Sequence, residues 1–284
     1  MKKMLLCVLI LCMMHNLSVA HDHHKEYQQL ECTIIHVNQA GSHNNDQHAS
    51  HPHIPGPRTS RVPGNVATST NWSGYAAETN FSHPAKNSVS AVSGSWIVPH
   101  LAATPDNSYC SLWVGIDGYS SSTVEQIGTE HDWHNGSQQN YAWFEMYPGG
   151  SYLISGFPLT PGDVISASVV YSGNSIFTLT IANDTQKVYF TVPTSYTRST
   201  TAQRSCAEWI VEAPFLNGIL PLADFVTAYL WGCNATINGV SAPINNGSWQ
   251  HTAIEMVTNN GTPKAIPSPI LPDNGSFFVT WAHE

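Results

Sequence analysis

Acidic side chains occur within strand-like aromatic segments at three places in the sequence. Asp117 closes the apolar run 113–117, Glu145 lies inside YAWFEMYP (141–148), and AEWIVE (207–212) carries two acids four residues apart. A carboxyl group among apolar neighbours has a raised pKa, because burial disfavours its charged form. Such carboxyls are suited to moving protons in hydrolysis, as general base or as general acid.

The strand period predicts which way the acids of AEWIVE point. Side chains alternate between the two faces of a strand, so Glu208, Ile210 and Glu212 share one face and Trp209 and Val211 share the other. A face with two acids is not expected to be a core face. We expect it to be open to solvent or to line a groove, and three such segments in one domain favour an acidic groove with aromatic walls.

The common hydrolase signatures are absent from the sequence. There is no GxSxG, no HExxH, and no Asp-Thr-Gly or Asp-Ser-Gly. His131 and His134 stand three apart within EHDWH, which we interpret as a surface loop before Asn135-Gly136 rather than as a metal site. A cysteine nucleophile is disfavoured because the cysteines are better explained as disulfides.

The segments that must position these acids have a β pattern throughout. From Asn71 onward, short runs rich in Val, Ile, Thr, Tyr and Trp alternate with turn pairs such as Asn238-Gly239, and no stretch sustains a helical apolar repeat. Residues 71–284 therefore predict one all-β domain, a β-sandwich of two packed antiparallel sheets. The strands expected with most support are 164–171, 176–181, 187–192 and 277–281.

The N-terminus indicates export. Lys2 and Lys3 precede an apolar run that ends before Ser18-Val19-Ala20, which is the pattern of a signal peptide over residues 1–20. We therefore expect a protein secreted to the extracellular space or the periplasm, with no membrane span. After cleavage four cysteines remain, and structural disulfides are expected among them; they are Cys32, Cys110, Cys206 and Cys233.

Residues 21–70 differ from the domain that follows. They are rich in histidine and proline, and apart from Thr33 to Val37 little in them could form a core, so we interpret them as a poorly ordered leader or prosegment. A mere spacer and a copper- or zinc-binding tract are the alternatives. The histidines concerned are His21, His23, His24, His36, His43, His48, His51 and His53.

Charge excludes one class of function. Residues 71–284 hold fifteen Asp and Glu against five Lys and Arg, so the basic surface that nucleic-acid binding needs is absent. Only 10% of the chain is charged. This composition fits either a secreted β-protein rich in Ser, Thr and Asn or a protein meant for acid, where few bases limit cationic repulsion.

Five short motifs, in order, resemble those of the glutamic peptidases, also called the eqolisin family. The resemblance covers essentially all of 71–284 and implies a two-sheet sandwich, an acid-acting endopeptidase of protein or peptide substrates, and no metal or cofactor. A monomer is expected. The motifs are NWSGY (71–75), WVGIDG (113–118), EQIG (125–128), YAWFEMYP (141–148) and AEWIVE (207–212).

The resemblance also implies the site residues. The catalytic Gln of the family falls on Gln126 and the catalytic Glu on Glu208, with Glu208 activating a water and the Gln126 amide binding the oxyanion. Glu130 stands where relatives often have Asp, and the strand pattern leaves Glu212 open as an alternative catalytic acid. The residues expected to bind substrate or orient the catalytic pair are Trp72, Trp113, Asp117, Glu130 and Glu145.

Two other classes use similar ingredients. A carbohydrate-binding or glycoside-cleaving β-sandwich also combines aromatic walls with paired carboxylates, but it has no required role for Gln126. A non-catalytic secreted adhesin or copper carrier would depend on the histidine-rich leader.

Overall fold

The computed structural model describes residues 26–37, 58–62 and 66–284, and every regular element in these ranges is a β-strand. The predicted all-β sandwich of two packed sheets is confirmed. The strands pair antiparallel except for two parallel pairs, β4 with β17 and β1 with β13. No helix in the described ranges is long and apolar enough to cross a membrane.

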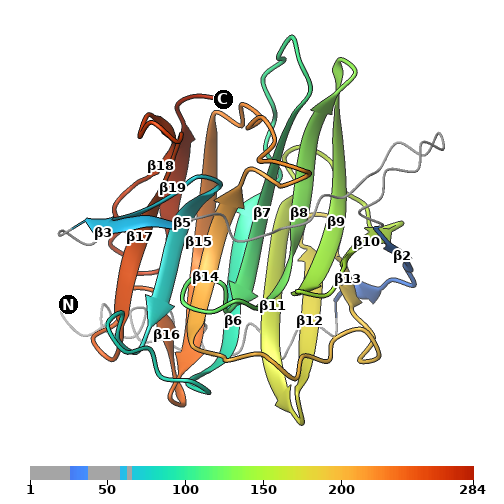
Figure 1. Ribbon diagram of the computed structural model, residues 1–284. Coiled ribbons are helices and arrows are strands. Elements are labelled where there is room, and N and C mark those ends of the chain that lie inside the picture. The colour runs from blue at the N-terminus through green and yellow to red at the C-terminus, as the bar shows by residue number, and fades with distance from the viewer. Residues whose placement is uncertain (1–25, 38–57, 63–65) are drawn as a thin grey trace, which may run out of the picture.

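The first sheet carries the acidic segments identified in the sequence. Figure 1 shows its central strands side by side, with β14 between β7 and β5. Its strands in spatial order are β2 (Thr33–His36), β10 (Ser151–Ser155), β9 (Ser137–Tyr147), β8 (Val124–His134), β7 (Ser108–Ile116), β14 (Cys206–Glu212), β5 (Trp72–Glu78), β17 (Gln250–Val257), β4 (Val66–Ser69) and β3 (Arg58–Val62).

The second sheet packs against one face of the first. One further strand, β18 (Pro263–Pro267), pairs with β17 of the first sheet and with β19 of the second, so it joins the two sheets along one side. The strands of the second sheet are β1 (Gln28–Gln29), β13 (Val188–Thr191), β12 (Ile176–Asn183), β11 (Val164–Gly173), β6 (Val89–Ile97), β15 (Thr227–Ile237), β16 (Val240–Pro243) and β19 (Phe277–Trp281).

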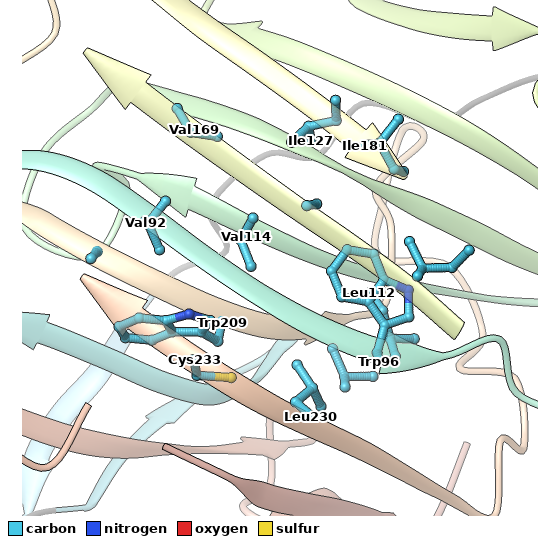
Figure 2. Close-up of a cluster of buried hydrophobic side chains, with 14 of the residues drawn as sticks. Val92, Trp96, Leu112, Val114, Ile127, Val169, Ile181, Trp209, Leu230 and Cys233 are labelled. Carbon is cyan, nitrogen blue, oxygen red and sulfur yellow. The ribbon is translucent and has the colours of Figure 1, made fainter. Parts of the chain in front are cut away.

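The main hydrophobic core fills the space between the sheets. Figure 2 shows Trp209 of β14 close to Cys233 of β15, with Val114 of β7 and Val92 of β6 in the same cluster. Alternate residues of each strand enter this core, as the period of two requires. The indole nitrogen of Trp209 donates to the carbonyl oxygen of Ser93 at 2.7 Å, so its one polar group is satisfied.

The strand predictions agree with the structure, whereas the disulfide prediction is wrong. The four runs expected as strands are β11, β12, β13 and β19. All four cysteines outside the signal segment are free thiols. Cys110 points into the core between the sheets and Cys206 points to the opposite face of the first sheet, and the register places them at opposite ends of the adjacent strands β7 and β14, so these two cysteines cannot meet.

The interpretation of 21–70 as poorly ordered is wrong for its described parts. Residues 28–29 and 33–36 form β1 and β2, and 58–62 and 66–69 form β3 and β4. These strands are short, but β1, β2 and β4 each pair with a strand of the domain that supplies hydrogen bonds, and β3 pairs with β4. The signal segment and seven of the eight leader histidines lie outside the described residues.

Candidate active site

Strand register aligns Gln126 and Glu208 on one face of the first sheet. Gly115 of β7 lies opposite Gln126 of β8 on one side and opposite Glu208 of β14 on the other. Residues directly opposite one another point to the same face, and adjacent strands lie about 4.8 Å apart. The Cα atoms of Gln126 and Glu208 are therefore roughly 9–10 Å apart, with a residue that has no side chain between them.

Gly115 is required at this position by its neighbours. A Cβ atom there would lie 2.9 Å from Cζ3 of Trp113 and 3.2 Å from Cβ of Gln126. Gly128 is required beside the same residue, because a Cβ at Gly128 would lie 2.3 Å from the Leu112 carbonyl oxygen and 2.5 Å from Cβ of Trp113. The two glycines let the large Trp113 side chain lie against this face of the sheet, with its ring over Gly115.

Glu145 fixes the orientation of the Gln126 amide. It lies opposite Gln126 on β9, and the Gln126 Nε2 donates to its Oε2 at 3.0 Å. Both side chains are buried. Because only the nitrogen end of an amide donates, this bond determines which end of the Gln126 side chain faces β9.

Glu208 is fully buried, and one of its oxygens has no partner. Its Oε1 accepts a hydrogen bond from the Tyr119 backbone N–H at 3.2 Å, and no described group bonds its Oε2. Burial raises the pKa of Glu208 well above its ordinary value, and the charges of Asp117 and Glu78 add to this, although the Tyr119 amide and the Cys206 thiol lower it. Glu208 is therefore a stronger base than an exposed glutamate.

Glu212 is buried on the same face but is fully engaged. Its Oε1 accepts from Asn71 Nδ2 at 3.0 Å, and its Oε2 accepts from Trp113 Nε1 at 2.8 Å. Burial raises the pKa of Glu212, and these two hydrogen bonds lower it. Of the two alternatives predicted for this face, open to solvent or lining a groove, the first is wrong, since both acids of AEWIVE have 0% exposure.

The aromatic residues predicted for the site surround these acids. Trp72 packs edge-on against Trp113, with ring centroids 4.9 Å apart. The far edge of the Trp72 ring reaches the turn after β7, because a Cβ at Gly118 would lie 2.8 Å from its Cη2. Trp72, Trp113, Tyr119 and Ile210 belong to a second hydrophobic cluster that covers this face.

The carboxylate of Asp117 accepts hydrogen bonds from backbone and side-chain groups near the starts of two strands. Its Oδ2 accepts from the backbone N–H groups of Gln203 and Arg204 at 2.7 and 2.6 Å, and its Oδ1 accepts from the backbone N–H of Ser205 at 2.9 Å. Thr123, three residues before Gln126, donates to the same carboxylate at 3.3 Å. Asp117 thus ties the start of the strand that carries Glu208 to the start of the strand that carries Gln126.

Glu130 lies away from Gln126, beside Asp132 and Glu212. Four residues of strand separate it from Gln126, which is roughly 13 Å. Burial and the charges of Asp132 and Glu212 raise the pKa of Glu130 well above its ordinary value. Burial also raises the pKa of Asp132 to about 8, against the hydrogen bond that Tyr141 donates at 3.0 Å.

His131 is not a surface-loop residue as predicted. It is fully buried in β8, and its ring nitrogens lie 2.9 Å from Thr129 Oγ1 and 2.9 Å from Asn140 Oδ1. Within residues 26–37, 58–62 and 66–284, no group of three or more His, Cys, Asp and Glu side chains could hold a metal ion.

Sequence reasoning missed three contributors to this arrangement. Gly115 separates the two proposed catalytic side chains, Tyr119 supplies the amide that binds Glu208, and Cys206 is buried two residues before Glu208 on the same face. The glycine within WVGIDG was the one available signal. The other two depend on a turn and on a burial that the strand pattern does not encode.

Comparison with known proteins gives one family and several relatives. The Peptidase A4 family matches residues 70–274. Scytalidopepsin B from Scytalidium lignicola is 30% identical over 158 residues, which are 53% of this chain and 58% of that protein. The chain therefore aligns with little more than half the length of this curated relative.

Solved structures share the fold. Scytalido-glutamic peptidase with a transition state analog inhibitor superposes with a TM-score of 0.60 at 24% identity, covering 75% of this chain and 98% of that one. Aspergilloglutamic peptidase from Aspergillus niger superposes with a TM-score of 0.53 at 25% identity, covering 62% of this chain and 99% of that one.

Proposed function

The chain belongs to the peptidase A4 family, and on that premise we propose that it is a glutamic endopeptidase that cleaves proteins and peptides with Glu208 and Gln126. The resemblance to glutamic peptidases that the sequence motifs indicate is confirmed by the family match. The proposal rests above all on one observation, the register that aligns Gln126, Gly115 and Glu208 across three adjacent strands.

The reacting atoms would lie between Glu208 and Gln126, beside the Trp113 ring that packs over Gly115. A water bound at the unpartnered Oε2 of Glu208 would give a proton to that carboxylate and attack the carbonyl carbon of the scissile peptide bond. The carbonyl oxygen then becomes an oxyanion, and the second N–H of Gln126 Nε2, the one that Glu145 does not accept, would donate to it. A donor preset in this way contributes about 3–4 kcal/mol to transition-state stabilisation in other hydrolases.

Collapse of the intermediate uses the same proton. Glu208, now protonated, donates it to the leaving nitrogen, the C–N bond breaks, and the carboxylate is restored. General acid catalysis of this kind accounts for about 10²–10⁴-fold in rate. An amide suits the oxyanion role in acid because its donor does not titrate.

The remaining site residues would position this pair and the substrate. Glu145 orients the Gln126 amide, and Asp117 fixes the chain on both sides of the reacting space. We assign substrate contact to Trp72 and Trp113, and Glu130 to the far end of the same face. Glu212 holds Trp113 and is not the catalytic acid in this proposal.

Acid conditions suit this arrangement. The pKa values of Glu130, Asp132 and Glu212 are raised mainly by burial, so these side chains remain protonated well above the pH at which ordinary carboxyls ionise. While they are protonated, the fold contains no buried charge at these positions. Burial raises the pKa of Glu208 as well, so the lower pH limit of activity, where the base is lost, would lie above that of an exposed glutamate, and activity would fall again at high pH, where the carboxyl cluster ionises. We further infer a secreted monomer without cofactor, metal or nucleic-acid partner.

A digest of a denatured protein substrate across the pH range, with an inhibitor panel, tests this proposal. Peptide products should form in acid and persist with chelator, pepstatin and serine- or cysteine-directed reagents. Hydrolysis of a glucan but not of the protein would instead support the glycosidase alternative. Loss of activity on chelation and its recovery with zinc would contradict the Glu208 and Gln126 mechanism.

A further inference from the structure

Part of the leader lies along one side of the sandwich and pairs with both sheets. β1 pairs parallel with β13 of the second sheet, and β2 pairs antiparallel with β10 of the first sheet. β13 otherwise pairs only with β12, and β10 otherwise pairs only with β9, among the described strands. Residues 26–37, which we call the N-terminal clip, thus add a strand to each sheet at its edge.

The clip satisfies backbone groups that an edge strand would leave unpaired. The Gln28 N–H donates to the Lys187 carbonyl at 2.9 Å, and the Leu30 N–H donates to the Tyr189 carbonyl at 2.8 Å. At the other end, the Val37 N–H donates to the Ser151 carbonyl at 3.0 Å. Unpaired edges are templates for aggregation, so covering them protects the fold.

The clip also closes the space between the sheets. Leu30, Cys32 and Ile34 are partly buried and pack against the core that lies between the two sheets, whereas Ile35 is 45% exposed on the other side of β2. On the opposite side of the sandwich, β18 joins the sheets by pairing with β17 and β19. The clip therefore does on one side what an internal strand of the domain does on the other.

We propose that the N-terminal clip is a permanent part of the folded protein, which stays bound when the chain is cut between residues 37 and 58. The edges of β10 and β13, with the apolar surface between them, form a surface whose partner is this segment of the same chain. Retention is non-covalent, since Cys32 is a free thiol. This inference concerns the fold and stands whether or not the proposed catalytic pair is correct.

A cleavable chain tests retention directly. Residues 44–50 are replaced by the recognition sequence of a specific protease, the folded protein is cut, and size exclusion is followed by intact mass measurement at pH 4 and pH 7. We expect the fragment that contains residues 26–37 to co-elute with the domain in equal amounts. Separation of the two fragments, with or without loss of the fold, would overturn the proposal.

Two neighbouring isoleucines provide a matched pair in the uncut chain. Ile34→Ser removes an apolar contact with the core and should lower Tm by about 4 °C. It should also speed alkylation of Cys32, mapped by mass spectrometry to its own peptide, by about tenfold, because the clip opens more often. Ile35→Ser changes an exposed side chain and should alter neither quantity. Equal behaviour of the two variants would refute the clip's role.

Discussion

Trp113 donates its indole N–H to Oε2 of Glu212 at 2.8 Å, across the boundary between β7 and β14. The second acid of AEWIVE is thereby engaged in holding an aromatic side chain, and its other oxygen accepts from Asn71. Glu208, on the same face of the same strand, keeps Oε2 unpartnered among the described groups. Two acids with the same strand pattern thus have different surroundings.

This difference predicts opposite outcomes for two isosteric variants. Glu208→Gln should lower kcat by at least about 10³-fold, because an amide cannot take a proton from water. Glu212→Gln should lower kcat by less than about tenfold, since the role of Glu212 is to position Trp113. Activity is measured on a protein substrate at acid pH. Circular dichroism must show that both variants are folded, and a folded Glu208→Gln protein with near wild-type rate would end the assignment.

The hydrogen bond between Gln126 and Glu145 predicts a graded effect. Gln126→Ala removes the oxyanion donor and should lower kcat by about 10²–10³-fold. Glu145→Ala leaves the donor in place but unoriented, so we expect a smaller fall, about tenfold, that appears in kcat rather than in KM. If Glu145→Ala were as severe as Gln126→Ala, Glu145 would have a chemical role beyond orientation.

Gly115 predicts a steric effect at the centre of the site. A methyl group there would lie 2.9 Å from the Trp113 ring and 3.2 Å from Gln126 Cβ, so Gly115→Ala should cost about 1–3 kcal/mol of stability and at least about tenfold in kcat. Gly247→Ala is the matched control, because a methyl group at Gly247 would meet nothing within 4 Å. Denaturant unfolding and turnover of both variants provide the comparison.

The sequence predicted much of this fold from local patterns. Alternation placed Trp209 and Val211 on the face opposite to Glu208 and Glu212, and both lie in the core because apolar side chains on one face of a strand must be covered. The order of five motifs indicated Gln126 and Glu208 as the candidate catalytic pair. Neither result required knowledge of which strands pair.

Register and burial could not be predicted in the same way. Gly115 lies between Gln126 and Glu208 because β7 pairs with both β8 and β14, and β14 is about ninety residues further along the chain. Cysteine count favoured disulfides, but Cys110 and Cys206 point to opposite faces. The leader was expected to be poorly ordered because its composition cannot form a core, yet its short strands use edges that the domain supplies.

Asp132 predicts a loss of stability at high pH. Burial raises its pKa to about 8, above the 3.9 of an unfolded chain, so the folded state binds an extra proton between these values. Protonated Asp132 therefore contributes to the free energy of unfolding below pH 3.9. This contribution is lost as pH rises to 8, and the free energy of unfolding falls by about 1.4 kcal/mol per pH unit. Asp132→Asn should flatten the pH dependence of unfolding, and it retains an acceptor for Tyr141.

Exposed Asp106 is the control for this effect. Asp106→Asn should leave the slope of unfolding free energy against pH unchanged, because its carboxyl lies outside the buried cluster. Urea unfolding at pH 4, 6 and 8 measures the slope for each protein. If Asp132→Asn lost stability with rising pH as steeply as the wild type, other carboxyls such as Glu130 would carry the effect instead.

His131 predicts an opposing effect in acid. Asn140 Oδ1 is an acceptor, so His131 Nδ1 donates to it, and Nε2 accepts from the Thr129 hydroxyl, whose oxygen also accepts from Trp96 Nε1 at 2.9 Å. The neutral ring satisfies all of these groups. Burial lowers the pKa of His131 to about 4, although the bond to Asn140 raises it.

Titration of His131 changes the free energy of unfolding with pH in the opposite direction to titration of Asp132. Because the folded pKa of about 4 lies below the unfolded value of 6.5, the unfolded chain binds more protons between them. The stability from neutral His131 is present above pH 6.5 and is lost as pH falls to 4, about 3 kcal/mol in all. His131→Gln can donate to Asn140 and accept from Thr129 without titrating, so it should be free of this loss.

His83→Gln is the control for this prediction, because it makes the same substitution at an exposed histidine. The free energy of unfolding is measured at pH 4, 5, 6 and 7. Its dependence on pH should be the same for His83→Gln as for the wild type, and the loss of stability in acid should be smaller for His131→Gln. The double variant His131→Gln with Asp132→Asn should keep the most uniform stability from pH 4 to 8. Parallel curves for His131→Gln and wild type would contradict this, because they would show that His131 titrates equally in the folded and unfolded states.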